Sequence, residues 1–137
     1  MIAIIKANFN SEITNLLLQG CISELNEQQS VYEIWEVPGA VEIVGLASQL
    51  SKQNKYQAII TIGAVIQGDT DHYTYVCEYL TIGLSQLSIL SPIPIVFGVL
   101  TTQTEELAME RAAINKMNKG KEFASCAIEM IALYKKI

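Results

Sequence analysis

Four side chains of rare types give this sequence its clearest capacity for acid–base and anion-binding chemistry. His72 is the only histidine and Arg111 the only arginine, and the only two aspartates are Asp69 and Asp71. Three of the four fall within residues 68–72, where the hydrophobic pattern predicts that a buried strand gives way to a helix. Because histidine exchanges protons near neutral pH, this segment is a candidate for proton transfer.

Gly68 and Thr70, at the same predicted helix start, could form an anion site. They leave backbone N–H groups and a hydroxyl near the positive end of the helix dipole, an environment that suits phosphate. An ordinary helix cap explains the same residues without a ligand, with Asp69 or Thr70 capping and Gly68 only allowing the turn. The local sequence favours this simpler explanation, because capping residues occur at every helix start.

His72 and Arg111 also have structural explanations that stay open. The pattern places His72 about one turn into the helix, near enough to move protons for a ligand, but a single helical histidine can be a packing residue. Arg111 falls on the helix after the fourth predicted strand, where its guanidinium could bind phosphate in a bidentate manner. The alternative is a solvated charge. An ion pair along the helix is disfavoured, because the positions three and four residues away are not acidic.

Two phenylalanines are candidates for stacking on a flat heterocycle. Phe9 follows the first predicted strand and lies between Asn8 and Asn10, which makes it the better candidate. Phe97 falls within the fourth predicted strand and would ordinarily belong to the core. Other chemistries lack support, since the sequence has no P-loop, no Gly-x-Gly-x-x-Gly, no Cys/His cluster and no Ser/His/Asp ordering.

The hydrophobic pattern predicts a parallel α/β scaffold that would position these residues. Apolar, β-branched runs predict four buried strands separated by segments with helical spacing. The runs lie at residues 2–7, 31–37, 56–66 and 94–100. Thr102 and Glu105 have the spacing of a capping box, which predicts a helix through about Ala113 before a final helix. Such alternation implies right-handed crossovers, a sheet covered on both faces, and ligands at the carboxyl ends of the strands.

Size and composition favour a single domain, residues 1–137, that associates with copies of itself. A chain of 137 residues has room for one compact core. Half of the residues are hydrophobic and only 17% are charged, so some apolar surface is expected to be covered in an oligomer. The net charge of −5 argues against a nucleic-acid partner, since phosphate backbones require clustered Lys and Arg.

The sequence predicts neither a membrane nor a secreted location. No apolar stretch reaches the roughly 18 uninterrupted residues of a membrane span. The first residues form an apolar run without the basic start and cleavage site of a secretory signal. The widely spaced Cys21, Cys77 and Cys126 fit small buried hydrophobic residues better than disulfides or metal ligands. A reducing cytoplasm fits best.

Several motifs, in a fixed order along nearly the whole chain, resemble those of lumazine synthases. They are NFN at 8–10, VPGAVEI at 37–43, GAVIQGDTDH at 63–72, FGVLTT at 97–102, ERA at 110–112, NKG at 118–120 and AIEM at 127–130. Together they outweigh the simpler explanations above. The resemblance implies a flavodoxin-like three-layer αβα sandwich around a four-stranded parallel sheet. It also implies an enzyme that joins a ribitylamino-pyrimidinedione to dihydroxybutanone phosphate in the step before riboflavin.

The resemblance further implies roles for individual residues. Phe9 would stack on the pyrimidine ring, whose edge would be read by backbone groups near Val65 and Ile66. His72 would shuttle protons, and Phe97 would close the pocket from a neighbouring subunit. Two further sets would hold the ribityl chain and the sugar phosphate. These sets are Ala40, Val41 and Glu42 for the ribityl chain, and Gly68, Asp69, Thr70 and Arg111 for the phosphate.

The expected partners are small-molecule substrates and copies of the chain itself, with no metal and no cofactor. Members of the resembling family form pentamers, which in some cases pack into a hollow shell. The shell and an enclosed riboflavin synthase both stay open for this sequence. The reaction condenses an amine with a ketone, eliminates phosphate and closes a ring, so it needs positioning, a proton shuttle and an anion site.

Departures from the family pattern leave one alternative open. Gln67 stands where many members have a basic residue, Asn8 where a basic or small residue is frequent, and Val41 where an aromatic residue is usual. Asn115 takes the place of a lysine, so slow turnover is expected. Gln67 and Asn115 keep open a carrier protein that retained the pocket and lost catalysis, although the retained His72 and Arg111 both oppose it. A phosphate-receiving signalling domain is disfavoured, because it would need acidic residues after the first strand and an aspartate ending the third.

Overall fold

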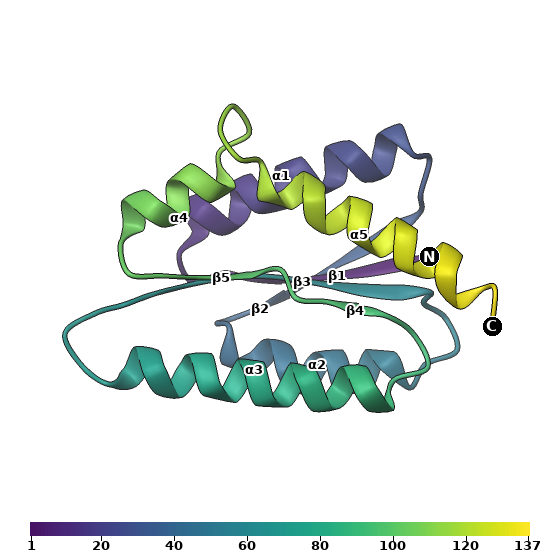
Figure 1. Cartoon of the computed structure of the whole chain (residues 1–137), viewed down its shortest axis with the longest axis horizontal. Coiled ribbons are helices and arrows are strands. Elements are labelled where there is room, and N and C mark those ends of the chain that lie inside the picture. The colour runs from purple at the N-terminus through teal and green to yellow at the C-terminus, as the bar shows by residue number, and fades with distance from the viewer.

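The computed structural model describes residues 1–137 and forms three layers, with a sheet between two layers of helices (Figure 1). The strands are β1 (Ile2–Ala7), β2 (Tyr32–Val37), β3 (Ala58–Ile66), β4 (Ile95–Val96) and β5 (Val99–Thr102). The helices are α1 (Ser11–Glu27), α2 (Val41–Ser51), α3 (His72–Leu90), α4 (Glu105–Ala112) and α5 (Lys119–Tyr134). Helices α1, α4 and α5 cover one face of the sheet, and α2 and α3 cover the other (Figure 1). The predicted three-layer α/β fold is confirmed.

All strand pairs are parallel, and the order across the sheet is β2-β1-β3-β4, with β5 beside the second half of β3. The central strands β1 and β3 are buried along almost their whole length, as expected for strands covered on both faces. Because the strands are parallel, their carboxyl ends meet at one edge of the sheet, on the left in Figure 1. Any ligand site built from strand ends must lie at this edge.

The fourth strand position is divided into β4 and β5, where the sequence predicted one continuous strand. Both pieces keep the same register with β3, since Ile59 pairs with Ile95 and Gly63 with Val99. Between the pieces, the Thr61 hydroxyl donates to the Val96 carbonyl at 2.8 Å and accepts from the Gly98 N–H at 3.1 Å. The Thr61 side chain thus takes the place of backbone hydrogen bonds between neighbouring strands. The hydrophobic pattern of a sequence does not predict such a replacement.

The core has two parts separated by the sheet. Ile2 and Ile4 of β1 pack with α1 and α5, whereas Ala3 and Ile5 pack with α2 and α3, as strand alternation requires. Each fully buried isoleucine contributes about 1.5–3 kcal/mol by its transfer from water. Packing on both faces fixes the sheet against both helix layers, and this holds the strand ends in place.

The start of α4 corrects one expectation. The capping residue is Thr104, whose hydroxyl accepts from the Leu107 N–H at 3.2 Å, and not Thr102. Thr102 is the last residue of β5, where it pairs with Ile66, so the cap lies two residues later, at Thr104, and the helix begins at Glu105. The predicted capping box with Glu105 is therefore wrong, because Leu107 occupies the third helical position.

All three cysteines are free. Cys21 is buried, and its burial raises the thiol pKa to about 12. Cys77 is partly buried, but Cys126 is exposed, so the expectation that all three are small buried hydrophobic residues is wrong for Cys126.

None of the helices is both long enough and apolar enough to span a membrane.

Candidate active site

A cleft of about 500 Å³ lies where the carboxyl ends of β1 and β3 meet the first turns of α2 and α3. It is lined by Phe9, Asn10, Pro38, Gly39, Ala40, Val41, Glu42, Ala64, Val65, Ile66, Gly68, Thr70, His72, Tyr73 and Val76. The set combines apolar walls with a few polar groups, as is usual for sites that bind small molecules. Nine of the twelve site residues proposed from the sequence are among them, all except Asp69, Phe97 and Arg111.

The segment after β1 holds Phe9 at the rim of the cleft, where the side chain is 71% exposed. The Asn8 and Phe9 N–H groups donate to the Val37 and Pro38 carbonyls at 2.8 and 3.0 Å. Asn10 has a left-handed backbone (φ 61°), which asparagine tolerates better than most residues, and its Nδ2 donates to the Ala64 carbonyl at 2.8 Å. These bonds fix the segment against the ends of both neighbouring strands.

The start of α2 supplies a second wall. Ala40 is its capping residue and offers no side-chain acceptor, so the first N–H groups of the helix have no side-chain cap. Glu42 lies in the first turn, where a carboxylate is favoured by the helix dipole. A Cβ added at Gly39 would lie 3.2 Å from Glu42 Oε1, so this carboxylate folds back over the helix start. The wall therefore presents both hydrogen-bond donors and an acceptor.

The loop from β3 to α3 brings His72 to the mouth of the cleft. His72 is the first residue of α3 and is exposed, so the expectation that it lies one turn into the helix is wrong. Its N–H lies 3.4 Å from the Thr70 hydroxyl, a long contact, and the capping residue Asp71 makes no side-chain bond. Gly68 has open space around it, and Asp69 is exposed beside the cleft. The ordinary-cap explanation is therefore supported only by the long Thr70 bond, and Asp69 makes no capping bond.

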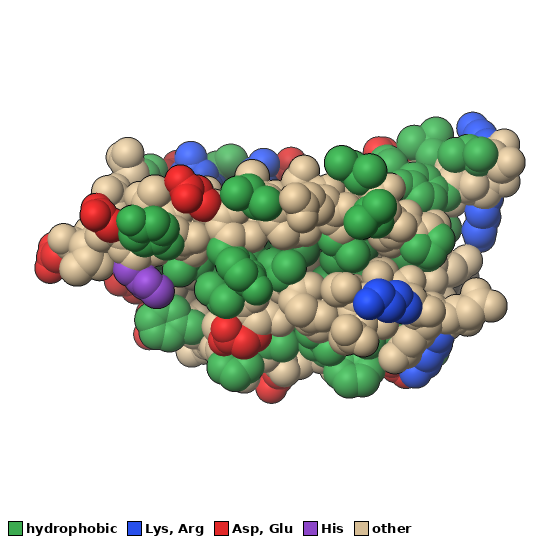
Figure 2. Space-filling model, turned by 90° about the horizontal axis from the view of Figure 1, so that it is seen from below, with side chains coloured by type: hydrophobic (Ala, Val, Ile, Leu, Met, Phe, Trp, Pro, Cys, Tyr) green, Lys and Arg blue, Asp and Glu red, His purple; other side chains and the backbone are tan.

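Figure 2 views the face covered by α2 and α3, and the only histidine of the sequence lies near one end of it. Hydrophobic and acidic side chains lie next to it, and hydrophobic side chains continue across the face. The histidine thus borders apolar surface on one side and solvent on the other. A side chain in this position can exchange protons with water and with a ligand in the cleft.

Arg111 and Phe97 lie outside the cleft. Arg111 is on α4, in the opposite helix layer from α2 and α3, and its Nη1 donates to the Leu107 carbonyl at 3.1 Å. It makes no ion pair, as the sequence predicted. Phe97 is 44% exposed and lines a separate hollow of about 230 Å³ beside Leu84 of α3, so it is not a core residue. One chain alone does not bring these two residues to His72.

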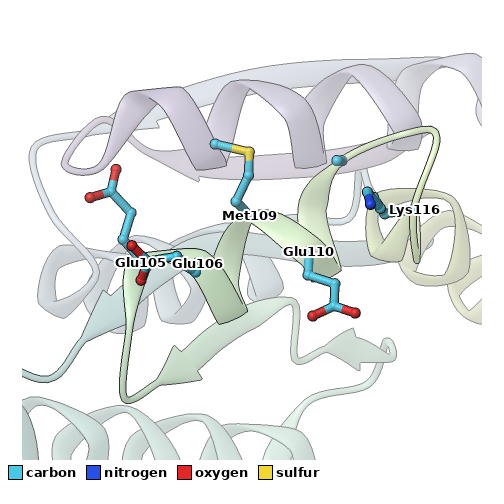
Figure 3. Close-up of a pocket in the computed structure, with 6 residues that line it drawn as sticks. Glu105, Glu106, Met109, Glu110 and Lys116 are labelled. Atoms are coloured by element: carbon cyan, nitrogen blue, oxygen red, sulfur yellow. The ribbon is translucent and has the colours of Figure 1, made fainter.

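A second cavity of about 570 Å³ lies along α4 and the turn that follows it. Figure 3 shows Glu105, Glu106 and Glu110 around it, together with Met109 and Lys116. Three carboxylates against one lysine create a negative potential, which repels phosphate and other anions. Nowhere in the structure do three or more His, Cys, Asp or Glu side chains lie together as metal ligands. The cleft, with its apolar walls and free N–H groups, is therefore the better candidate for an active site.

Sequence comparisons identify the family. The chain matches the family profile described as 6,7-dimethyl-8-ribityllumazine synthase over residues 1–135. It is 45% identical over 140 residues to the 6,7-dimethyl-8-ribityllumazine synthase of Coxiella burnetii strain Dugway 5J108-111. It is 44% identical to the protein of the same name in strain CbuG_Q212, and each alignment covers 99% of this chain and 92% of the relative. The chain belongs to the 6,7-dimethyl-8-ribityllumazine synthase family.

Membership settles the class of reaction. The chain is an enzyme of riboflavin biosynthesis that forms 6,7-dimethyl-8-ribityllumazine by a transferase-type condensation. The resemblance noted from the sequence motifs, and the activity that it implied, are confirmed. The signalling-domain and carrier alternatives are not supported.

Sequence reasoning missed several residues that line this cleft. Tyr73 and Val76 of α3 face the cleft beside His72. Burial, with Cys77 nearby, raises the pKa of the Tyr73 hydroxyl. A helical spacing of four residues from His72 to Val76 could have indicated this shared face. Nothing in the sequence indicates the bond from Asn10 to the Ala64 carbonyl, because it joins residues 54 positions apart.

Proposed function

We propose that this cleft binds the ribitylamino-pyrimidinedione and that its amine condenses there with dihydroxybutanone phosphate. The observation that carries the proposal is the convergence of Phe9, the start of α2, the end of β3 and His72 on one cleft of about 500 Å³. The substrate needs an aromatic platform, hydrogen-bond partners and a proton shuttle, and the cleft offers each of them. A single-domain enzyme, residues 1–137, fits the two cores packed on one sheet.

The pyrimidine side of the cleft is proposed to lie between β1 and β3. Phe9 would stack its exposed ring on the heterocycle, a contact of about 0.5–1.5 kcal/mol beyond its buried area. Backbone groups of Val65 and Ile66, at the end of β3, would read the polar edge of the ring. The uncapped start of α2 would hold the ribityl hydroxyls, with N–H groups near Ala40 and Val41 as donors and the Glu42 carboxylate as acceptor.

His72 is proposed to move protons during the condensation. The amine attacks the ketone carbon, and a proton passes from nitrogen to the oxygen that leaves as water, which gives an imine. Phosphate is then eliminated, and ring closure releases a second water. His72 at the mouth of the cleft can take the proton from the amine and return it to the leaving oxygen. None of these steps consumes a metal or an organic cofactor.

Phosphate binding is proposed for the loop of Gly68, Asp69 and Thr70 together with Arg111. The loop contributes backbone N–H groups and a hydroxyl near the start of α3. Its aspartate carboxylate would repel the phosphate, so Asp69 would act through its backbone. Arg111 lies outside the cleft of its own chain, so we place it in the site of a neighbouring subunit, where Phe97 would also close the pocket.

A homopentamer is the assembly we propose, and apolar side chains on the surface of one chain support it. Exposed hydrophobic residues on α3 and in the segment between β4 and β5 include Tyr75 (67% exposed), Ile82 (58%), Ile89 (80%) and Phe97 (44%). Figure 2 shows such side chains across the face covered by α2 and α3. A patch of this kind is uncommon on a monomer. A cytoplasmic location stays a prediction, favoured by the three free cysteines.

The proposal is tested by substrate binding and turnover in matched aromatic variants. We expect Phe9→Ala to weaken pyrimidine binding about tenfold, because it removes the stacking platform and its buried area. Tyr134→Ala, which truncates a partly exposed aromatic residue near the end of α5, should bind the pyrimidine like the native protein. Binding is measured by ligand fluorescence and turnover by lumazine absorbance. Equal affinity in the two variants would place the pyrimidine elsewhere.

A further inference from the structure

Lys6 of β1 is the one buried lysine or arginine of the chain, with 5% of its surface exposed. Its Nζ donates to Asn8 Oδ1 at 3.0 Å and to Glu36 Oε1 at 3.3 Å. Lys6 follows Ile2 and Ile4 in the alternation of β1, so its side chain leaves the sheet on the α1 and α5 side. The cleft is lined from the α2 and α3 side, and Lys6 is not among its lining residues.

Stability alone does not explain a lysine at this position. A buried ammonium loses its hydration, and only good pairing compensates for that loss. The Lys6 side chain is 6% exposed and that of Glu36 is 57% exposed, so the buried ammonium is paired with a carboxylate that stays largely in water, and the pair compensates only weakly for the lost hydration. An apolar side chain of similar length is often as stabilising as a buried pair, or more so. The lysine therefore calls for an explanation in the residues that it touches.

The partner that connects Lys6 to the cleft is Asn8. The segment of Asn8, Phe9 and Asn10 is fixed at its far end by the bond from Asn10 to the Ala64 carbonyl. At its near end the backbone bonds to Val37 and Pro38 hold the main chain. The one side-chain contact that fixes the exposed Asn8 is the bond from Lys6. Lys6 thus reaches the Phe9 segment from the far side of the sheet.

We infer that Lys6 is a positioning residue, which holds Asn8 and through it sets the orientation of the Phe9 ring for stacking on the pyrimidine substrate. This inference rests on the stacking role proposed for Phe9. Lys6 touches neither substrate, so its effect is confined to the substrate that stacks on Phe9. The sugar phosphate, bound at the β3–α3 loop, is independent of it.

The test replaces the ammonium by an apolar group of similar length. Lys6→Met should raise the KM and Kd for the pyrimidine about fivefold to tenfold, the typical effect of one lost hydrogen bond. The KM for the sugar phosphate should stay within about twofold, and the melting temperature should be unchanged or higher. The matched control is Lys55→Met, which removes an exposed lysine paired at 2.8 Å with Glu33 of β2. It should leave both KM values unchanged.

A double-mutant cycle identifies the contact responsible. Asn8→Ala alone should weaken pyrimidine binding as much as Lys6→Met, and the two together should cause no further loss, since both remove one interaction. Asn8 is exposed, so its truncation does not disturb the core. Additive losses would overturn the inference, as would equal losses for both substrates with a lowered melting temperature, or native affinity in Lys6→Met. If instead Phe9→Ala binds the pyrimidine normally, the proposed stacking role itself is wrong, and the Lys6 variants do not decide that question.

Discussion

The two sides of the proposed site differ in how completely one chain builds them. On the pyrimidine side, Phe9, Val65 and Ile66 line the same cleft, because β1 and β3 are neighbours in a parallel sheet. On the phosphate side, Gly68 and Thr70 reach the cleft, but Arg111 lies on α4 in the other helix layer. Folding of one sheet therefore brings together the residues at strand ends, whereas the same chain leaves Arg111 outside the cleft, and for this reason we propose that a second subunit supplies it.

The largest effect is expected at His72, which lies between the two sides. His72→Ala should lower kcat about 100-fold, because general acid–base catalysis typically contributes at least this much. Its effect on the Kd of the pyrimidine should be small, since Phe9 and the start of α2 remain. Stopped-flow measurement of lumazine formation, with pyrimidine binding measured in parallel, separates the two quantities. A large loss of pyrimidine affinity would show that His72 belongs to the binding wall rather than to the proton path.

The next effect is expected at Arg111 and concerns the other substrate. Arg111→Ala should lower kcat/KM for the sugar phosphate about 30-fold, the typical contribution of a charge-assisted contact to a phosphate. Pyrimidine binding should not change. Lys116→Ala is the matched control, since it removes a nearby cation from the acidic cavity and not from the proposed site. Equal losses of pyrimidine binding in the Arg111 and His72 variants would contradict their separate roles.

A mixing experiment tests directly whether the phosphate side is shared between subunits. His72→Ala and Arg111→Ala chains are unfolded together and refolded into mixed oligomers. If each site takes these residues from two different chains, about one site in four regains both, and activity returns to about a quarter of the native value, roughly tenfold above the separate variants. Recovery is measured as initial rates at equal protein concentration. If activity does not recover in mixed oligomers of native size, Arg111 does not act in the site of a neighbouring subunit.

Much of the fold could be predicted because hydrophobic periodicity reports burial directly. The run predicted at residues 2–7 coincides with β1, and the second and third predicted strands differ from β2 and β3 only at their ends. The break between β4 and β5 could not be predicted, because it depends on the Thr61 hydroxyl replacing a ladder bond. The start of α4 was misplaced because Thr102 and Thr104 are both capping residue types, and only strand pairing decides between them.

The site was predictable where it follows the strand ends and unpredictable where it depends on tertiary contacts. Residues such as Val65 and Gly68 follow a recognisable strand, so their place at the sheet edge could be deduced. Tyr73 was missed because its burial against the cleft follows from the packing of α3 on the sheet. The contacts of Lys6 with Asn8 and Glu36 could not be predicted either, because a lysine within an apolar run does not indicate which residues its side chain will meet.

The smallest effect is expected at the cap of α4, the helix that carries Arg111. Thr104→Ala removes the bond to the Leu107 N–H and should lower the free energy of unfolding by about 1 kcal/mol. For a chain of this size, that corresponds to a melting temperature lower by about 3–5 °C. Gln103→Ala, at the exposed neighbouring position, should leave it unchanged. Because the only residue of α4 proposed for the site is Arg111, on the phosphate side, the KM of the sugar phosphate should rise slightly, by about twofold, while pyrimidine binding stays native. A matching loss of pyrimidine affinity in Thr104→Ala would show that the two sides are coupled through the sheet and are not the separately built regions described above.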